Sequence, residues 1–136
     1  MQIHINPSQA EITANKAIKL NPHDGRSYGI LGLMACRQGN WQKAVSDLQK
    51  ASQLSPQQPW IKSNLAWGLG KLGKWQEAET VINEALSLDG NCTFSLGVKA
   101  WILTQQNQWK QVIPPATQPC TSLLLRLLDC LDLKIA

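Results

Sequence analysis

Apolar and small residues recur along this chain at intervals of three, four and seven, the spacing that places side chains on one face of an α-helix. One recurring set is Tyr28, Leu31, Gly32 and Ala35, then Lys62, Leu65, Ala66 and Leu69, then Leu96, Lys99, Ala100 and Leu103. A second set is Ala44, Leu48, Ala51 and Pro56, then Ala78, Ile82, Ala85 and Gly90. The pattern predicts pairs of amphipathic helices, with small residues where two helices approach closely.

Tryptophan marks the corner between the two helices of each pair. Trp41, Trp75 and Trp109 are evenly spaced, and two positions before them stand Gly39, Gly73 and Asn107. Glycine and asparagine tolerate the left-handed backbone conformation in which many helices end. The sequence therefore predicts a helix–turn–helix unit that repeats at the spacing of these tryptophans.

This register resembles the tetratricopeptide repeat, which has a period of about 34 residues and the signature W-x2-L-G-x2-Y followed by A-x3-F, A and P. The first full repeat, residues 25–58, carries Tyr28, Leu31, Gly32, Ala44, Leu48, Ala51 and Pro56 at the matching positions. Residues 59–92 form the second repeat, with Gly90 in place of the terminal proline. The resemblance implies an all-α, right-handed superhelix of antiparallel helix pairs, a single domain of about seven helices over residues 1–136. It also implies that the corner tryptophans are structural wedges between repeats.

Both ends depart from the repeat. Residues 7–22 match only a second helix, so the chain begins with half a repeat or belongs to a longer protein. Asn6 and Pro7 are a good cap and first-turn pair, and we expect the first helix to start there. Residues 93–119 form a degenerate third repeat, which Pro114 and Pro115 interrupt.

A hydrophobic C-terminal helix is expected over residues 121–135, which are rich in leucine between Leu123 and Leu133. Three interpretations of this segment stay open. It replaces the interrupted second helix of the third repeat, it forms the seam of a homodimer, or it fills the protein's own groove.

Composition and charge exclude several function classes. Apolar residues make up 43% and charged residues 16%, which is typical of a globular chain. The net charge of +4 comes from scattered bases with no cluster, so we expect no nucleic-acid binding. There is neither a secretory signal nor an apolar stretch of membrane-spanning length, which favours a cytoplasmic protein without membrane insertion.

No arrangement of reactive side chains predicts an enzyme. Cys36, Cys92, Cys120 and Cys130 form no CxxC pair, and with only His4 and His23 no zinc spacing is present. Neither histidine has a nucleophile and an orienting group beside it. The sequence therefore predicts no catalytic residue, no metal site and no cofactor.

The resemblance implies a concave groove lined by the first helix of each pair. Its groove positions hold Trp60, Trp67, Phe94 and Trp101, flanked by Arg26, Arg37 and Lys71, together with Ile30, Leu33 and Asn64. Trp60 and Trp67 are seven positions apart, as are Phe94 and Trp101, and each pair therefore shares one helix face. Large aromatic side chains on an open surface are typical of protein interfaces. The alternative is that the chain itself covers them.

Asn64 stands where chaperone-adaptor members of the family hold a peptide backbone or carboxylate. The neighbouring clamp positions are Gly29, Leu33, Phe94 and Val98 rather than lysine, asparagine or arginine, which argues against a carboxylate clamp. The sequence thus predicts a scaffold or adaptor that binds a peptide or helix of a partner protein, apolar with an acidic flank. The alternative function is a homo-oligomerisation module that uses the leucine-rich C-terminal helix.

Overall fold

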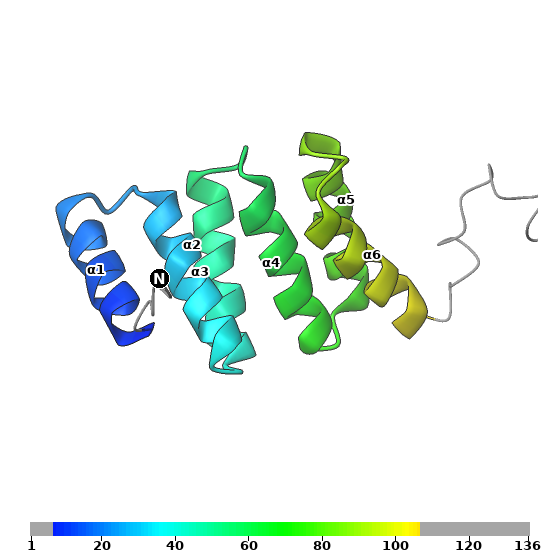
Figure 1. Ribbon diagram of the computed structural model, residues 1–136, viewed down its shortest axis with the longest axis horizontal. Coiled ribbons are helices and arrows are strands. Elements are labelled where there is room, and N and C mark those ends of the chain that lie inside the picture. The colour runs from blue at the N-terminus through cyan, green and yellow to red at the C-terminus, as the bar shows by residue number, and fades with distance from the viewer. Residues whose placement is uncertain (1–6, 107–136) are drawn as a thin grey trace, which may run out of the picture. The chain divides into compact units, whose positions relative to one another are not determined.

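A computed structural model describes residues 7–106, and within them every regular element is an α-helix (Figure 1). The helices are α1 (Pro7–Leu20), α2 (Gly25–Arg37), α3 (Trp41–Leu54), α4 (Pro59–Lys71), α5 (Trp75–Leu88) and α6 (Thr93–Gln105). The all-helical prediction is confirmed for these residues. The predicted helix over 121–135, the third corner at Trp109 and the interrupted segment 107–119 lie outside the described residues. The chain divides into two units, Met1–Ile102 and Leu103–Ala136, and the contacts described below belong to the first.

The helix ends follow from local side-chain chemistry. The Asp24 carboxylate accepts a hydrogen bond from the Arg26 backbone N–H at 3.2 Å and caps α2. In the same way, the Asn40 side chain accepts from the Lys43 N–H at 3.2 Å and caps α3. A proline opens α4, where its missing N–H would have had no helical partner.

Glycine ends the first helix of each described pair, as the sequence predicted. Gly39 has a φ of 74° and Gly73 a φ of 79°, both in the left-handed region. The next backbone N–H then turns back to the helix, from Asn40 to the Ala35 carbonyl and from Lys74 to the Leu69 carbonyl, each at 3.0 Å. This repeated turn sets the angle at which each second helix leaves its corner.

Consecutive helices pack against one another along the chain, α1 on α2, α2 on α3, α3 on α4 and α4 on α5. The core is formed by fully buried aliphatic side chains, which are Leu48, Ile61, Leu69, Ile82 and Ile102. Small residues permit the close approach, since a Cβ added at Gly32 would collide with the Leu48 side chain. The alanines at the recurring positions 44, 51, 66, 78 and 85 are also fully buried.

The first helices of successive pairs, α2, α4 and α6, also meet each other directly, and we call them the inner helices. α2 contacts α4. α4 and α6 are joined inside the protein by a hydrogen bond of 2.6 Å between the fully buried hydroxyls of Ser63 and Ser95. The inner helices α2, α4 and α6 thus lie next to one another in chain order.

Candidate binding groove

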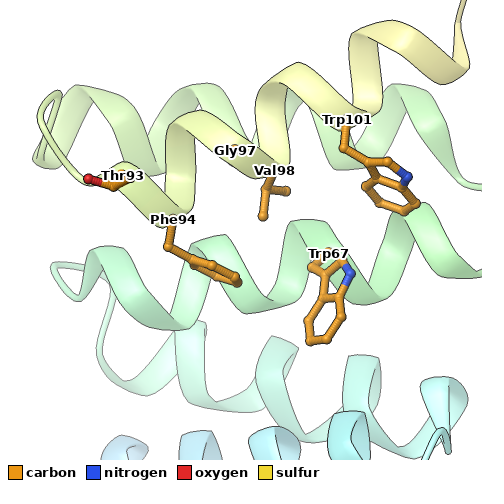
Figure 2. Close-up of a pocket in the computed structure, with 6 residues that line it drawn as sticks. All are labelled: Trp67, Thr93, Phe94, Gly97, Val98 and Trp101. Carbon is orange, nitrogen blue, oxygen red and sulfur yellow. The ribbon is translucent and has the colours of Figure 1, made fainter.

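A pocket of about 620 Å³ opens on the surface that α4 and α6 share. It is lined by Trp67 of α4 and by Thr93, Phe94, Gly97, Val98 and Trp101 of α6. Figure 2 shows the Phe94 and Trp101 rings on either side of Val98, with the Trp67 ring facing them from the neighbouring helix. Phe94 is 45% exposed, whereas Val98 is 5% exposed and belongs to the core. The pocket therefore has a buried valine at its base and aromatic walls made of one exposed ring and two half-buried ones.

Two edge-to-face tryptophan pairs support these walls. Trp41 meets Trp67 with ring centroids 5.3 Å apart at 70°, and Trp75 meets Trp101 at 5.3 Å and 67°. Both pairs join a corner tryptophan to the inner helix of the next repeat, so the contact recurs with the sequence period. Phe94 extends the first pair, because its ring lies edge-on to Trp67 at 6.3 Å. Such geometry is the favourable one for aromatic rings and fixes the walls in place.

Lys71 connects the two tryptophan pairs. Its ammonium nitrogen lies 5.7 Å from the centroid of the Trp41 ring and 5.3 Å from that of Trp101. A cation between two indole faces is attracted by both, and the attraction restricts an otherwise flexible side chain. The structure thereby holds a positive charge at the edge of the pocket, next to one of its walls.

Tryptophan rings of the following repeat pack against glycines on the inner helices. A Cβ added at Gly29 would lie 2.5 Å from Cη2 of Trp60, and one added at Gly70 would lie 2.5 Å from Cζ3 of Trp101. Both distances are far below the ordinary carbon–carbon contact. Trp60 and Trp101 are half-buried.

The other predicted groove residues are distributed more widely. Arg26, Arg37 and Ile30 are exposed on α2, and Leu33 is half-buried there. Asn64 is 7% exposed, and its side-chain amide donates a hydrogen bond of 2.8 Å to the Trp60 carbonyl.

The structure therefore brings together three of the predicted residues, Trp67, Phe94 and Trp101, in one pocket, with Lys71 beside it. Gly97 and Val98 stand at groove positions of the repeat, so the repeat register could have predicted them as pocket residues. Nothing in the sequence indicated Thr93.

Charge is segregated between the helix layers. The inner helices carry Arg26, Arg37, Lys62, Lys71 and Lys99 and contain no acidic residue. The carboxylates of the described residues lie on α1, α3 and α5 and in the turns. Of the inner-helix bases, Lys62 is neutralised by Glu84 of α5 at 2.6 Å. The described inner helices thus carry a net positive charge, and Lys71 is the base that lies beside a pocket residue, Trp101.

Two cysteines differ sharply in their environment. Burial raises the pKa of the Cys36 thiol to about 11, because the thiolate would lose its hydration. Hydrogen bonds from the side chain and backbone of Ser95 lower the pKa of Cys92, which is only half-buried just before the start of α6.

Over residues 7–106 no group of three or more histidine, cysteine or carboxylate side chains is placed to hold a metal ion. None of the helices in that stretch has the length and apolar character to cross a bilayer.

The fold and the groove define a helical repeat protein built from antiparallel helix pairs. A family model described as tetratricopeptide repeat matches residues 35–102, half of the chain. The chain belongs to the tetratricopeptide repeat family, as its regular register indicated.

Solved structures agree with this assignment. The chain is similar to MamA MSR-1, with a TM-score of 0.66 and 21% identity over 79% of this chain and 62% of that one. It is similar to the TPR domain of Arabidopsis OM64, with a TM-score of 0.68 and 18% identity over 73% and 82%. It is also similar to the first TPR of Spaghetti (RPAP3) bound to the HSP90 peptide SRMEEVD, with a TM-score of 0.70 and 18% identity over 74% and 82%.

At these identities the similarity concerns the fold, and it confirms the predicted superhelical class. The chain spans less than two thirds of the length of the MamA chain. Among curated proteins none matches this sequence.

Proposed function

We propose that this chain is a protein-interaction module whose inner-helix groove binds an apolar segment of a partner protein. The observation that carries the proposal is the pocket of Trp67, Phe94, Val98 and Trp101. Its aromatic walls are held by ring contacts with the corner tryptophans, so little conformational entropy is lost when a ligand binds. Burying one leucine- or phenylalanine-sized side chain there would contribute about 1.5–3 kcal/mol.

Charge indicates the chemistry that flanks the apolar anchor. Lys71 stands at the pocket edge between two indole rings, and no ion pair neutralises it within the described residues. Arg37 closes the preceding inner helix and is likewise exposed. A carboxylate next to the anchor of a ligand would meet this field, which favours faster association and discriminates against basic ligands.

The peptide SRMEEVD bound by the Spaghetti TPR is acidic. In the present chain the positions of a carboxylate clamp hold Gly29, Leu33, Phe94 and Val98, and Asn64 donates its side-chain amide to its own helix. We therefore propose recognition through an apolar anchor with acidic neighbours, without capture of a terminal carboxylate.

A displayed library of random peptides selected against the purified chain tests this function. Recovered sequences should combine a large apolar residue with aspartate or glutamate. The matched variants are Phe94→Ala and Leu96→Ala, because both side chains are on α6 and are 45% and 48% exposed, but only Phe94 lines the pocket. Phe94→Ala should weaken binding of the selected peptides about tenfold, with Leu96→Ala near wild type. Equal affinities of the two variants, or a selection without apolar and acidic enrichment, would contradict the proposal.

A further inference from the structure

Gly97 has no reason for being glycine among the residues that the structure describes. It lies inside α6, where glycine is less favourable than alanine or most other residues. A Cβ added at this position would meet no atom of residues 7–106 within 4 Å, and the backbone there has no positive φ. The position is exposed and lines the pocket. Gly97 therefore lowers helix stability at a position that lines the pocket. A glycine at such a position is explained if a ligand packs closely against the backbone there.

The two preceding inner helices show what approaches such a glycine. Gly29 of α2 lies under the Trp60 ring of α4, and Gly70 of α4 lies under the Trp101 ring of α6. In both cases the ring belongs to the next inner helix. Within its own repeat, the tryptophan stands three positions earlier than the glycine does in the preceding repeat. Gly97 occupies the same repeat position as Gly29, two repeats later. Among residues 7–106, however, no side chain covers Gly97 in the way that Trp60 covers Gly29.

We propose that the partner segment is an α-helix that packs on α6 as one further inner helix, with a large apolar side chain over Gly97. This inference rests on the proposed function and specifies its ligand. The helices whose tryptophans cover these glycines, α4 and α6, each carry two aromatic residues seven positions apart. These are Trp60 with Trp67 and Phe94 with Trp101. We infer the same spacing on the partner, since side chains at that interval share one face of a helix.

The charge of the partner helix follows from the surface it covers. The inner helices carry only basic residues, and Lys71 is fixed beside Trp101 at the pocket edge. Inner helices of this chain are themselves cationic, so a second copy would bring like charges together. An acidic amphipathic helix of a different protein is therefore the occupant that complements both the apolar seat and the field around it.

A designed probe tests the helix directly. It is a lactam-bridged helical peptide with two tryptophans seven positions apart on one face and glutamates on the flanking positions. There are three companion peptides. In one the glutamates are replaced with lysines, in another one tryptophan is moved to the opposite face, and in the third added prolines keep the peptide extended. Calorimetric titration of the full chain should give a measurable affinity for the acidic helical probe. The affinity of each companion peptide should be at least about tenfold weaker.

Gly97→Leu is the decisive variant, because Gly97 lines the pocket and a Cβ added there would meet no atom of residues 7–106 within 4 Å. Binding of the acidic helical probe should fall about tenfold or more, while the urea midpoint stays at or above that of wild type. Leu96→Phe is the matched control and should bind nearly as wild type, because it enlarges an exposed, uncharged side chain on the same helix outside the pocket residues.

The outcomes separate the two proposals. Unchanged affinity of Gly97→Leu, or an extended peptide that binds as tightly as the helical one, overturns the helix proposal and leaves the groove function standing. If the helical probe binds only by dissociating a dimer seen in light scattering, the occupant is a second copy and the inference is wrong. If neither helical nor extended acidic peptides bind, the groove function fails with it.

Discussion

Gly70, in the last turn of α4, and Gly97, in the interior of α6, provide a test of how the inner helices are packed. Replacing Gly97 with alanine gives the full gain in helix propensity, at most about 1 kcal/mol, whereas the gain at the end of a helix is smaller. At Gly97 the new methyl group meets no atom of residues 7–106 within 4 Å, so Gly97→Ala should raise the free energy of unfolding by up to about 1 kcal/mol. At Gly70 the methyl group would lie 2.5 Å from the Trp101 ring and 3.2 Å from Trp75.

The Trp101 ring cannot yield to this methyl group without losing other contacts. It is edge-on to Trp75 at 5.3 Å, and the Lys71 ammonium lies 5.3 Å from its centroid. Loss of the ring pair costs about 0.5–1.5 kcal/mol, and loss of the cation contact costs about 0.5–1 kcal/mol at an exposed site. The packing loss is therefore about 1–2.5 kcal/mol, and the difference in stability between the two alanine variants should be at least this large.

Urea denaturation followed by far-ultraviolet circular dichroism measures this difference. Gly70→Ala should unfold at a lower urea concentration than Gly97→Ala, with equal slopes. Its near-ultraviolet spectrum should also change, because the tryptophan pair is displaced. Equal midpoints for the two variants would refute the assignment of Gly70 as the seat of the Trp101 ring.

Three further predictions concern reactivity, pH and charge. Cys92 should be alkylated faster than Cys36 at neutral pH, as peptide mapping by mass spectrometry would show; equal rates would contradict the burial of Cys36. The free energy of unfolding should fall as the pH rises from 9.0 to about 11, because the unfolded Cys36 thiol ionises in this window while the folded one stays protonated, and Cys36→Ala should remove that slope. Glu84→Gln should cost less than about 1 kcal/mol in urea denaturation and lose its effect in high salt, since the Glu84 side chain is 53% exposed in its ion pair with Lys62.

The helix pairs could be predicted from the sequence because their determinants are local and periodic. Gly39 and Gly73 end helices through a backbone conformation that glycine adopts readily, and the regular spacing of Trp41 and Trp75 places both corners at once. Alanines at fixed intervals then indicate which faces meet. The helix count of about seven includes residues 121–135, which lie outside the described part of the chain.

The sequence predicted which helix face carries the aromatic residues, but it did not predict how their rings are arranged. Repeat positions placed Trp67, Phe94 and Trp101 on one surface, and the pocket contains all three. The same reasoning did not show that Gly29 is covered by Trp60, since which ring fills which gap depends on packing between helices far apart in sequence. Nor did it show that the corner tryptophans support the groove tryptophans edge-on, because periodicity specifies the face but not the ring orientation.

The proposed function places an acidic, apolar segment of a partner protein in the pocket between α4 and α6. Its most direct test is a nuclear magnetic resonance titration of the full chain with the acidic tryptophan-bearing helical probe, observed at the assigned Val98 methyl and Trp67 and Trp101 indole signals. We expect these signals to shift saturably with the acidic probe and not with its lysine counterpart. Saturable shifts confined to residues outside the pocket, or equal shifts with both probes, would contradict the claim.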